Sequence, residues 1–448
     1  ASQQLMYVPT MAMRQGDFSG LVNSANVLQQ LYDPSTTQGA ALQYSRLPFS
    51  NNQIPLNRIS PLAKTLYAAT PTPTSADNPM INFNLNGQNP TSQTVPNYTV
   101  RLDHVFNEKN RVYFRFTDIR QDQMALRNYP IASPANIATS ELEEGSTGYQ
   151  AIPVQTISGA LGYSKTFSPT LFSETILSMQ WQRMYVQGPD RAMKNFEKQF
   201  GLPNSLGNVG FPDIGANLFM PYGGSQWYYG MSQRVSTLDE NLNKIWGKHQ
   251  IAFGFRIRHE HFAYLSDRSV DQVAYTNQAT GIYDPTTGAN YGVRANTGNQ
   301  NADFFLGAAA SYSERRNAPF NIASLMEYDS YFQDNWRVNN RLTLNFGLRW
   351  EYATPRWERD NVLSNFDPST NTMLKASGGS IYNRSLVNPD RNNFAPRIGI
   401  AWTPMPNTVI RGGYGMSFIH QNRVGSADLL GINYPQVVIA TINQSNPL

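Results

Sequence analysis

Cysteine is missing altogether from this sequence of 448 residues. Its absence excludes a disulfide framework, a thiolate metal site and a cysteine nucleophile. Charge is also scarce, because Asp, Glu, Lys and Arg together make up only 15% of the chain. The net charge of +4 is spread along the sequence without the Lys/Arg-rich runs that track phosphates, so nucleic acid is not an expected partner.

Long apolar runs are equally absent. No stretch of 18 or more apolar residues occurs, which excludes a transmembrane helix. Catalytic signatures are missing too: the sequence has no nucleophile elbow, no phosphate-binding loop and no HExxH motif. His259 and His261 could share one face of a strand, but no third ligand accompanies them. We therefore expect no enzyme activity, no cofactor and no metal.

Aromatic residues and strict alternation are what the sequence has in abundance. Aromatic residues reach 12%, with 24 tyrosines. From Leu342 to Trp350 every second residue is apolar, and the residues between them are polar or glycine. A period of two is the mark of a β-strand with one apolar and one polar face. The polar run from Val338 to Arg341 predicts a tight turn before it, and hence an antiparallel hairpin.

The same pattern predicts ten strands in five hairpins within residues 97–448. The expected hairpins cover 97–119, 155–185, 235–264, 327–352 and 395–418. Turns within the hairpins are short, whereas tens of residues separate one hairpin from the next. Such alternation is typical of an all-β, antiparallel transmembrane β-barrel, here a portion of about ten strands with long extracellular loops. Residues 1–96 read as a long, mostly irregular loop segment with one short helix, Ser60–Ala68.

Tryptophans and charged residues mark the two faces of these strands. A tilted strand crosses the apolar part of a bilayer in about 9 to 11 residues, so indoles at both ends would form interface girdles. The girdle residues are Trp181, Trp246, Trp336, Trp350 and Trp402. Charged residues on the polar faces suit a wet or plugged lumen. This expected lumen wall consists of Arg101, Asp103, Arg115, Arg256, Arg258, Arg349, Glu351, Arg397 and Arg411.

Several segments together resemble a known family. They are GDFSG, LYDPSTT, NQIPLNRISPLAKTL, NYTVRLDHVFNEKNRVYFRF, ADFFLG, SYFQDNWRVNNRLTLNFGLRWEY and FAPRIGIAWTPMPNTVIRGGYGMSF. In these segments the chain resembles the large TonB-dependent outer-membrane receptors that carry an N-terminal carboxypeptidase-regulatory-like domain. The resemblance implies a 22-stranded barrel around a plug. This chain would be an interior fragment of that barrel, without the plug and the N-terminal domains.

The resemblance also implies a function and partners. It implies active uptake of a large or scarce substrate across the outer membrane of a Gram-negative bacterium. The partners would be outer-membrane lipid, an unknown substrate and a TonB-type energy-coupling protein, which would contact the missing N-terminal part. We expect the wall arginines to face plug carboxylates, with attraction of anionic substrate groups as the alternative. These arginines are Arg256, Arg258, Arg349, Arg397 and Arg411. A soluble or surface all-β protein with a binding or adhesion role is the alternative that the sequence leaves open.

Overall fold

The computed structural model describes most of the chain. The described residues are 2–40, 43–89, 91–126, 149–186, 196–208, 212–215, 218–219, 222, 228–267, 271–283, 292–316, 321–419, 430–431 and 433–444. In this described part, no helix is both long and apolar enough to cross a bilayer.

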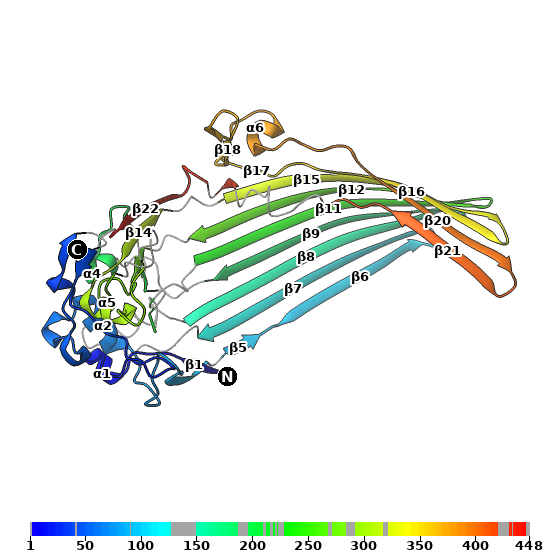
Figure 1. Ribbon diagram of the computed structural model, residues 1–448. Coiled ribbons are helices and arrows are strands. Elements are labelled where there is room, and N and C mark those ends of the chain that lie inside the picture. The colour runs from blue at the N-terminus through cyan, green and yellow to red at the C-terminus, as the bar shows by residue number, and fades with distance from the viewer. Residues whose placement is uncertain are drawn as a thin grey trace.

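Ten long antiparallel strands dominate the structure (Figure 1). They are β6 (Asn97–Asn107), β7 (Asn110–Leu126), β8 (Tyr149–Ser168), β9 (Leu171–Val186), β11 (Tyr228–Trp246), β12 (His249–Asp267), β15 (Asn321–Asn339), β16 (Leu342–Ala353), β20 (Asn393–Met405) and β21 (Thr408–Gly415). Each long strand pairs with the next one along the chain in a 12-stranded sheet. The remaining two, β5 (Thr91–Thr94) and β17 (Trp357–Glu358), pair with β7 and β15 beyond the ends of β6 and β16. The predicted all-β fold is confirmed.

All five short turns lie at one end of the sheet (Figure 1). The turn between β11 and β12 places Gly247 at a φ of 58°, and the turn between β20 and β21 places Asn407 at a φ of 67°. Glycine and asparagine tolerate this left-handed backbone, which explains why these residues occupy the turns. The connections between hairpins leave from the other end, as the sequence predicted.

The sheet is open and has one broad apolar face. Residues paired directly across an antiparallel ladder project to the same side, so Leu348, Phe332 and Phe253 share one face. These side chains are nearly half exposed. In the described part of the chain no second sheet packs over them. A sandwich with buried inner faces is therefore excluded, and an apolar face toward lipid explains the exposure.

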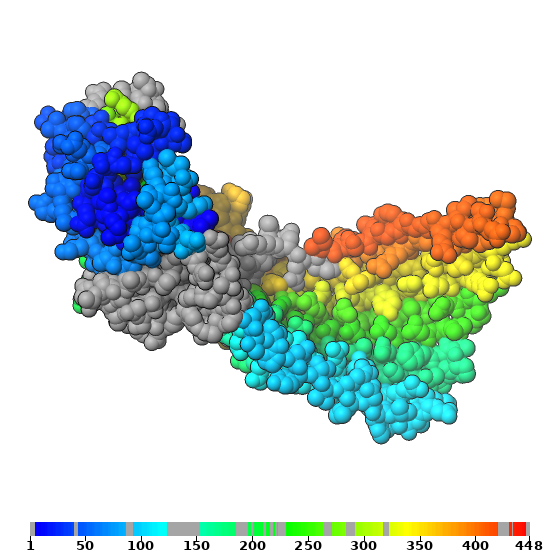
Figure 2. Space-filling model, turned by 90° about the horizontal axis from the view of Figure 1, so that it is seen from below, coloured from blue at the N-terminus to red at the C-terminus, as the bar shows by residue number. Residues whose placement is uncertain are grey.

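A packed body, called the loop body here, stands at the end of the sheet where the long connections leave (Figures 1 and 2). Residues 2–89 form most of it, joined by parts of residues 196–222, 271–316 and 430–444. Its α-helices are α1 (Met11–Arg14), α2 (Pro61–Ala69), α4 (Phe196–Phe200) and α5 (Gln300–Leu306), and 3-10 turns cover Pro34–Thr36, Ser50–Asn52 and Leu56–Arg58. The predicted helix is confirmed as α2, where the Ser60 side chain accepts from the Ala63 N–H.

Short strands complete the loop body and the connection after β16. One four-stranded sheet joins β10 (Asp213–Ile214), β13 (Gln272–Ala274), β14 (Ser311–Arg316) and β22 (Val438–Asn443). Two separate two-stranded antiparallel sheets pair β1 (Ser2–Met6) with β4 (Leu85–Asn89), and β2 (Gln38–Ala40) with β3 (Gln43–Ser45). Between β16 and β20 lie β18 (Ser364–Asp367), β19 (Thr372–Lys375) and α6 (Ile381–Ser385).

The core of the loop body is built from distant parts of the sequence. Phe304 of α5 is fully buried and meets the rings of Tyr67, Tyr222 and Tyr275 at centroid distances of 5.2 to 5.9 Å. The Tyr222 hydroxyl lies 2.6 Å from the Thr70 hydroxyl, so the buried phenol keeps a polar partner. Most of residues 2–89 has no regular secondary structure, yet this core holds it together.

Candidate functional site

The charged residues expected on the lumen wall share one face of the sheet, opposite the apolar face. The register pairs Arg101 with Arg115, and Arg349 on β16 lies between Tyr331 and Ala395 of the adjacent strands. Following the alternation across every ladder puts all nine residues on this side. We call it the charged face.

A buried carboxylate of the charged face connects an arginine of the sheet with an arginine of the segment that follows β16. Glu260 is only 3% exposed. Its two oxygens accept from Arg258 at 2.9 Å and from Arg356 at 2.7 Å. Arg258 also donates to Glu327 at 2.8 Å on the neighbouring strand. Each buried charge therefore has a partner, as burial requires.

Arg349 is the centre of a second group. Its guanidinium lies 2.6 Å from Glu351 and 3.3 Å from Asp329, and both carboxylates are largely buried. The sheet itself therefore supplies two carboxylates to Arg349. In the sequence, the spacing of Glu327 and Asp329 places both carboxylates on the polar face of β15, but it does not specify which arginine they meet.

The remaining wall residues fall into two sets. Arg101 pairs with Asp103 at 2.8 Å on the edge strand β6, and Arg256 pairs with Asp239 at 2.6 Å. The others are exposed and have no carboxylate partner among the described residues. They are Arg115, Arg397 and Arg411. These three are the guanidiniums of the expected wall that are open to an external partner.

All five tryptophans of the expected girdle project from the apolar face. Trp246 and Trp336 both pair in register with His249 beside a short turn, and Trp246 is 72% exposed. The indole of Trp181 donates to the Ser232 hydroxyl at 2.9 Å, and that of Trp350 donates to the Arg391 carbonyl at 2.9 Å. The fifth, Trp402, lies opposite Leu342, also beside a turn.

A carboxylate lies within the apolar face of β11. Glu240 of β11 lies opposite Phe255 and Thr175. Its oxygens accept from the hydroxyls of Ser173, at 2.7 Å, and Thr175. Glu240 lies six residues from Trp246 along β11. At about 3.3 Å per residue and a strand tilt of about 40°, Glu240 is about 15 Å from the level of Trp246 along the membrane normal. The two hydroxyls give this carboxylate the hydrogen bonds that lipid cannot.

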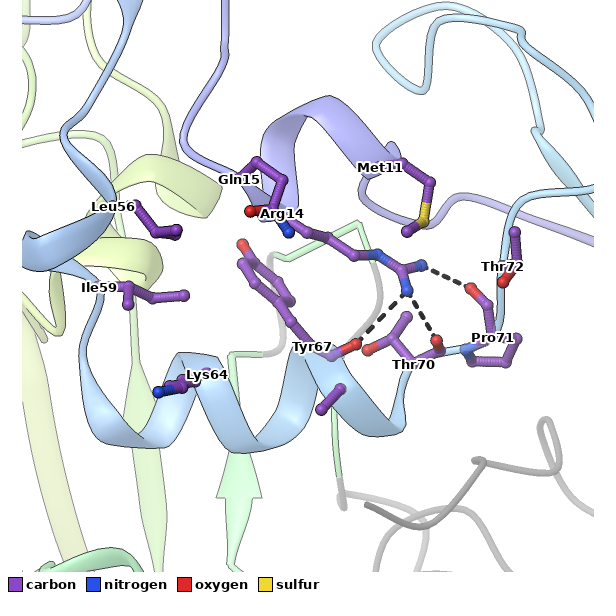
Figure 3. Close-up of a pocket in the computed structure, with 11 residues that line it drawn as sticks. Met11, Arg14, Gln15, Leu56, Ile59, Lys64, Tyr67, Thr70, Pro71 and Thr72 are labelled. Atoms are coloured by element: carbon purple, nitrogen blue, oxygen red, sulfur yellow. Dashed lines mark hydrogen bonds between the residues drawn. The ribbon is translucent and has the colours of Figure 1, made fainter. Parts of the chain in front are cut away.

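The loop body contains a cavity of about 510 Å³ between α1 and α2 (Figure 3). Arg14 lines it and donates to the carbonyls of Tyr67, Thr70 and Pro71, at 3.4, 2.7 and 2.5 Å. Those carbonyls lie at the C-terminal end of α2, where the helix dipole favours a cation. Burial lowers the pKa of Arg14.

The lining of this cavity combines charge with apolar surface. Lys64 is its second cation, and Met11, Leu56 and Ile59 supply apolar side chains. No carboxylate lines the cavity among the described residues. Such a lining can hold a ligand that has both an anionic and an apolar part.

His259 and His261 do lie on the same face of β12, as predicted. The Nδ1 atom of His261 is 3.3 Å from the Ser324 hydroxyl. The described residues contain no group of three or more His, Asp or Glu side chains that could hold a metal ion.

Comparisons with known proteins add a family to this geometry. The family model described as "Outer membrane beta barrel domain" matches residues 1–448. No curated protein matches the sequence.

Three solved structures illustrate which proteins the chain is similar to. P. aeruginosa FpvA bound to heterologous pyoverdines is 11% identical, with 72% of this chain and 35% of that chain covered and a TM-score of 0.38. The copper transporter OprC is 13% identical, with 72% and 37% of the two chains covered and a TM-score of 0.38. The ferric yersiniabactin uptake receptor FyuA from Yersinia pestis is 10% identical, with 72% and 37% of the two chains covered and a TM-score of 0.36. The chain spans little more than a third of the length of these receptors.

Proposed function

Since this chain belongs to the family of outer membrane beta barrel domains and so resides in the outer membrane of a Gram-negative bacterium, we propose that it forms part of a TonB-dependent receptor for active substrate uptake. In this proposal the sheet is a portion of the barrel wall. A TonB-type protein couples energy through parts outside the chain.

The observation that carries the proposal is the division of the sheet into two unlike faces. One face is apolar and exposed, with tryptophans near its ends, and the other holds buried ion pairs around Glu260 and Arg349. Lipid outside and a polar, filled lumen inside are the environments that satisfy both faces. The sequence segments that resemble TonB-dependent receptors support a transport role for this barrel.

The exposed arginines of the charged face are the proposed contacts of the plug. Arg115, Arg397 and Arg411 have no carboxylate partner in the described part of the chain, so a folded plug with acidic side chains would neutralise them permanently. Arg256, Arg258 and Arg349 are already neutralised by the sheet. The proposed plug contact therefore rests on Arg115, Arg397 and Arg411.

The cavity of the loop body is the proposed first contact of the substrate. It lies at the end of the sheet opposite the short turns, which is the outside of the cell if the turns are periplasmic. A size of about 510 Å³ suits part of a substrate rather than a whole large one.

Single-cysteine labelling tests the orientation, and the absence of native cysteine makes every signal unambiguous. Gly378→Cys, in the long connection after β16, should react with an impermeant maleimide on intact cells. Lys248→Cys, in a short turn, should react only after the outer membrane is opened. Equal labelling of both on intact cells would refute the orientation.

Leakage through the full-length receptor tests the plug contact. Arg397→Gln combined with Arg411→Gln should raise passive entry of small sugars into proteoliposomes, because the plug loses two ionic contacts. Arg234→Gln, on the apolar face, is the matched control and should leave entry unchanged. Unchanged entry in the double variant would refute the plug role of these arginines.

A further inference from the structure

A compact group of basic side chains lies on the apolar face of β9, β11 and β12. Trp181 pairs in register with Arg234, and Arg234 pairs with His261. Arg183 lies two residues beyond Trp181 on the same face, and its guanidinium carbon is 3.9 Å from the centre of the indole ring. We call Arg183, Arg234 and His261 the outer-face cluster.

The cluster lacks negative charge of its own. On this face of β9, β11 and β12 the carboxylate positions are Glu240, six residues from Arg234 along β11, and Asp267, six residues from His261 at the end of β12. Asp118 lies two strands away from β9, where it is bound by Arg120 at 3.0 Å and by Gln155 at 3.1 Å. Basic groups set directly opposite or diagonally across a ladder repel one another. A bound anion would offset this repulsion.

The position of the cluster relative to the membrane selects the anion. Trp181 lies ten residues after Leu171, the first residue beyond a short turn. At about 3.3 Å per residue and a tilt of about 40°, this distance is about 25 Å along the membrane normal, the height of the apolar band of such barrels. The cluster therefore lies at the head-group level of the leaflet opposite the turns. With the orientation proposed above, this is the outer leaflet.

We propose that the outer-face cluster binds the phosphate of an anionic lipid in the outer leaflet. Guanidinium groups bind phosphate through paired, charge-assisted hydrogen bonds. Two of them beside an indole at the head-group level would hold the phosphate while Leu177 and Met179, below Trp181 on the same strand, contact the acyl chains. The site lies on the outer surface of the barrel, apart from the lumen that the substrate would cross.

Lipid titration of the full-length receptor in a neutral detergent tests this proposal. The probes are short-chain phosphatidic acid, short-chain phosphatidylcholine and inorganic phosphate, with bound lipid counted by native mass spectrometry. We expect phosphatidic acid to bind, and Arg183→Gln combined with Arg234→Gln to weaken it about tenfold or more, as the loss of two charge-assisted contacts implies.

The matched control removes the same charge from the other face of the sheet. Arg115→Gln combined with Arg397→Gln should leave lipid binding unchanged, while thermal unfolding shows that both double variants are folded. Equal weakening in the two double variants would overturn the proposal, because it would mean attraction to net charge alone. If phosphatidylcholine bound as well as phosphatidic acid, the cluster would make only ordinary interfacial contacts and the proposal would fail. If inorganic phosphate fully displaced phosphatidic acid, the cluster would be a site for a free anion and not for a lipid. The leakage and labelling tests do not depend on this result, so the two proposals can fail separately.

Discussion

Substituting Leu348 by arginine is the most direct test of which face of β16 meets lipid. Leu348 is 48% exposed and lies directly between Phe332 and Pro396 on the apolar face. It follows Leu342, the first residue after the turn, by six residues, which is about 15 Å along the membrane normal at a tilt of about 40°. Leu348→Arg would thus set a guanidinium near the middle of the apolar band.

The expected cost can be bounded from known depth effects. Arginine on the lipid face near the midplane of such barrels costs about 2 to 4 kcal/mol. Phe346 is a less suitable site, because Asp334 lies directly opposite and could pair with the new charge. Asn345→Arg is the matched control on the charged face. It adds the same side chain three residues away and should cost less than about 1 kcal/mol, since its head reaches a polar surface.

Urea titration of the receptor in phosphatidylcholine vesicles, followed by tryptophan fluorescence, measures both variants. The expected result is a lower unfolding midpoint for Leu348→Arg, with Asn345→Arg close to the unmodified protein. Equal losses in the two variants would refute the assignment of lipid to one face and polar surroundings to the other. That result would instead indicate a strand buried on both faces.

Three further outcomes follow from buried groups. The double variant Ser173→Ala, Thr175→Val should destabilise the barrel by about 1 to 3 kcal/mol, because the Glu240 carboxylate loses its two hydrogen-bond donors. Adding Glu240→Leu to this variant should recover most of the lost stability in the same urea titration. Burial raises the pKa of Asp303 to about 7, so the folded loop body holds a proton that the unfolded chain releases near pH 4. Its stability should therefore fall as the pH rises from about 4 to about 7, and Asp303→Asn should flatten that dependence of the melting temperature. Phe304→Ala should cost the loop body about 3 to 5 kcal/mol, seen as early protease cleavage in residues 2–89 while the sheet stays intact.

The sequence by itself determined the strands, their faces and their pairing within each hairpin. Alternation with a period of two is a local property, so residues 342–350 specify both the strand and its apolar side without knowledge of any neighbour. Short turns then force consecutive strands to pair, which is why the five predicted hairpins all occur. For the same reason all nine residues of the expected wall, and all five tryptophans, could be assigned to their faces.

Tertiary structure alone decided which charges meet and what the irregular residues build. The pair of Arg349 with Asp329 depends on the register between β15 and β16, and the pair of Glu260 with Arg356 depends on the path of the segment after β16. Alternation along one strand specifies neither. The core around Phe304 joins side chains separated by more than 200 residues, and in aperiodic segments no local pattern reveals such contacts. The outer-face cluster likewise exists only because three strands bring Arg183, Arg234 and His261 to one level, a consequence of their register and not of their spacing in the sequence.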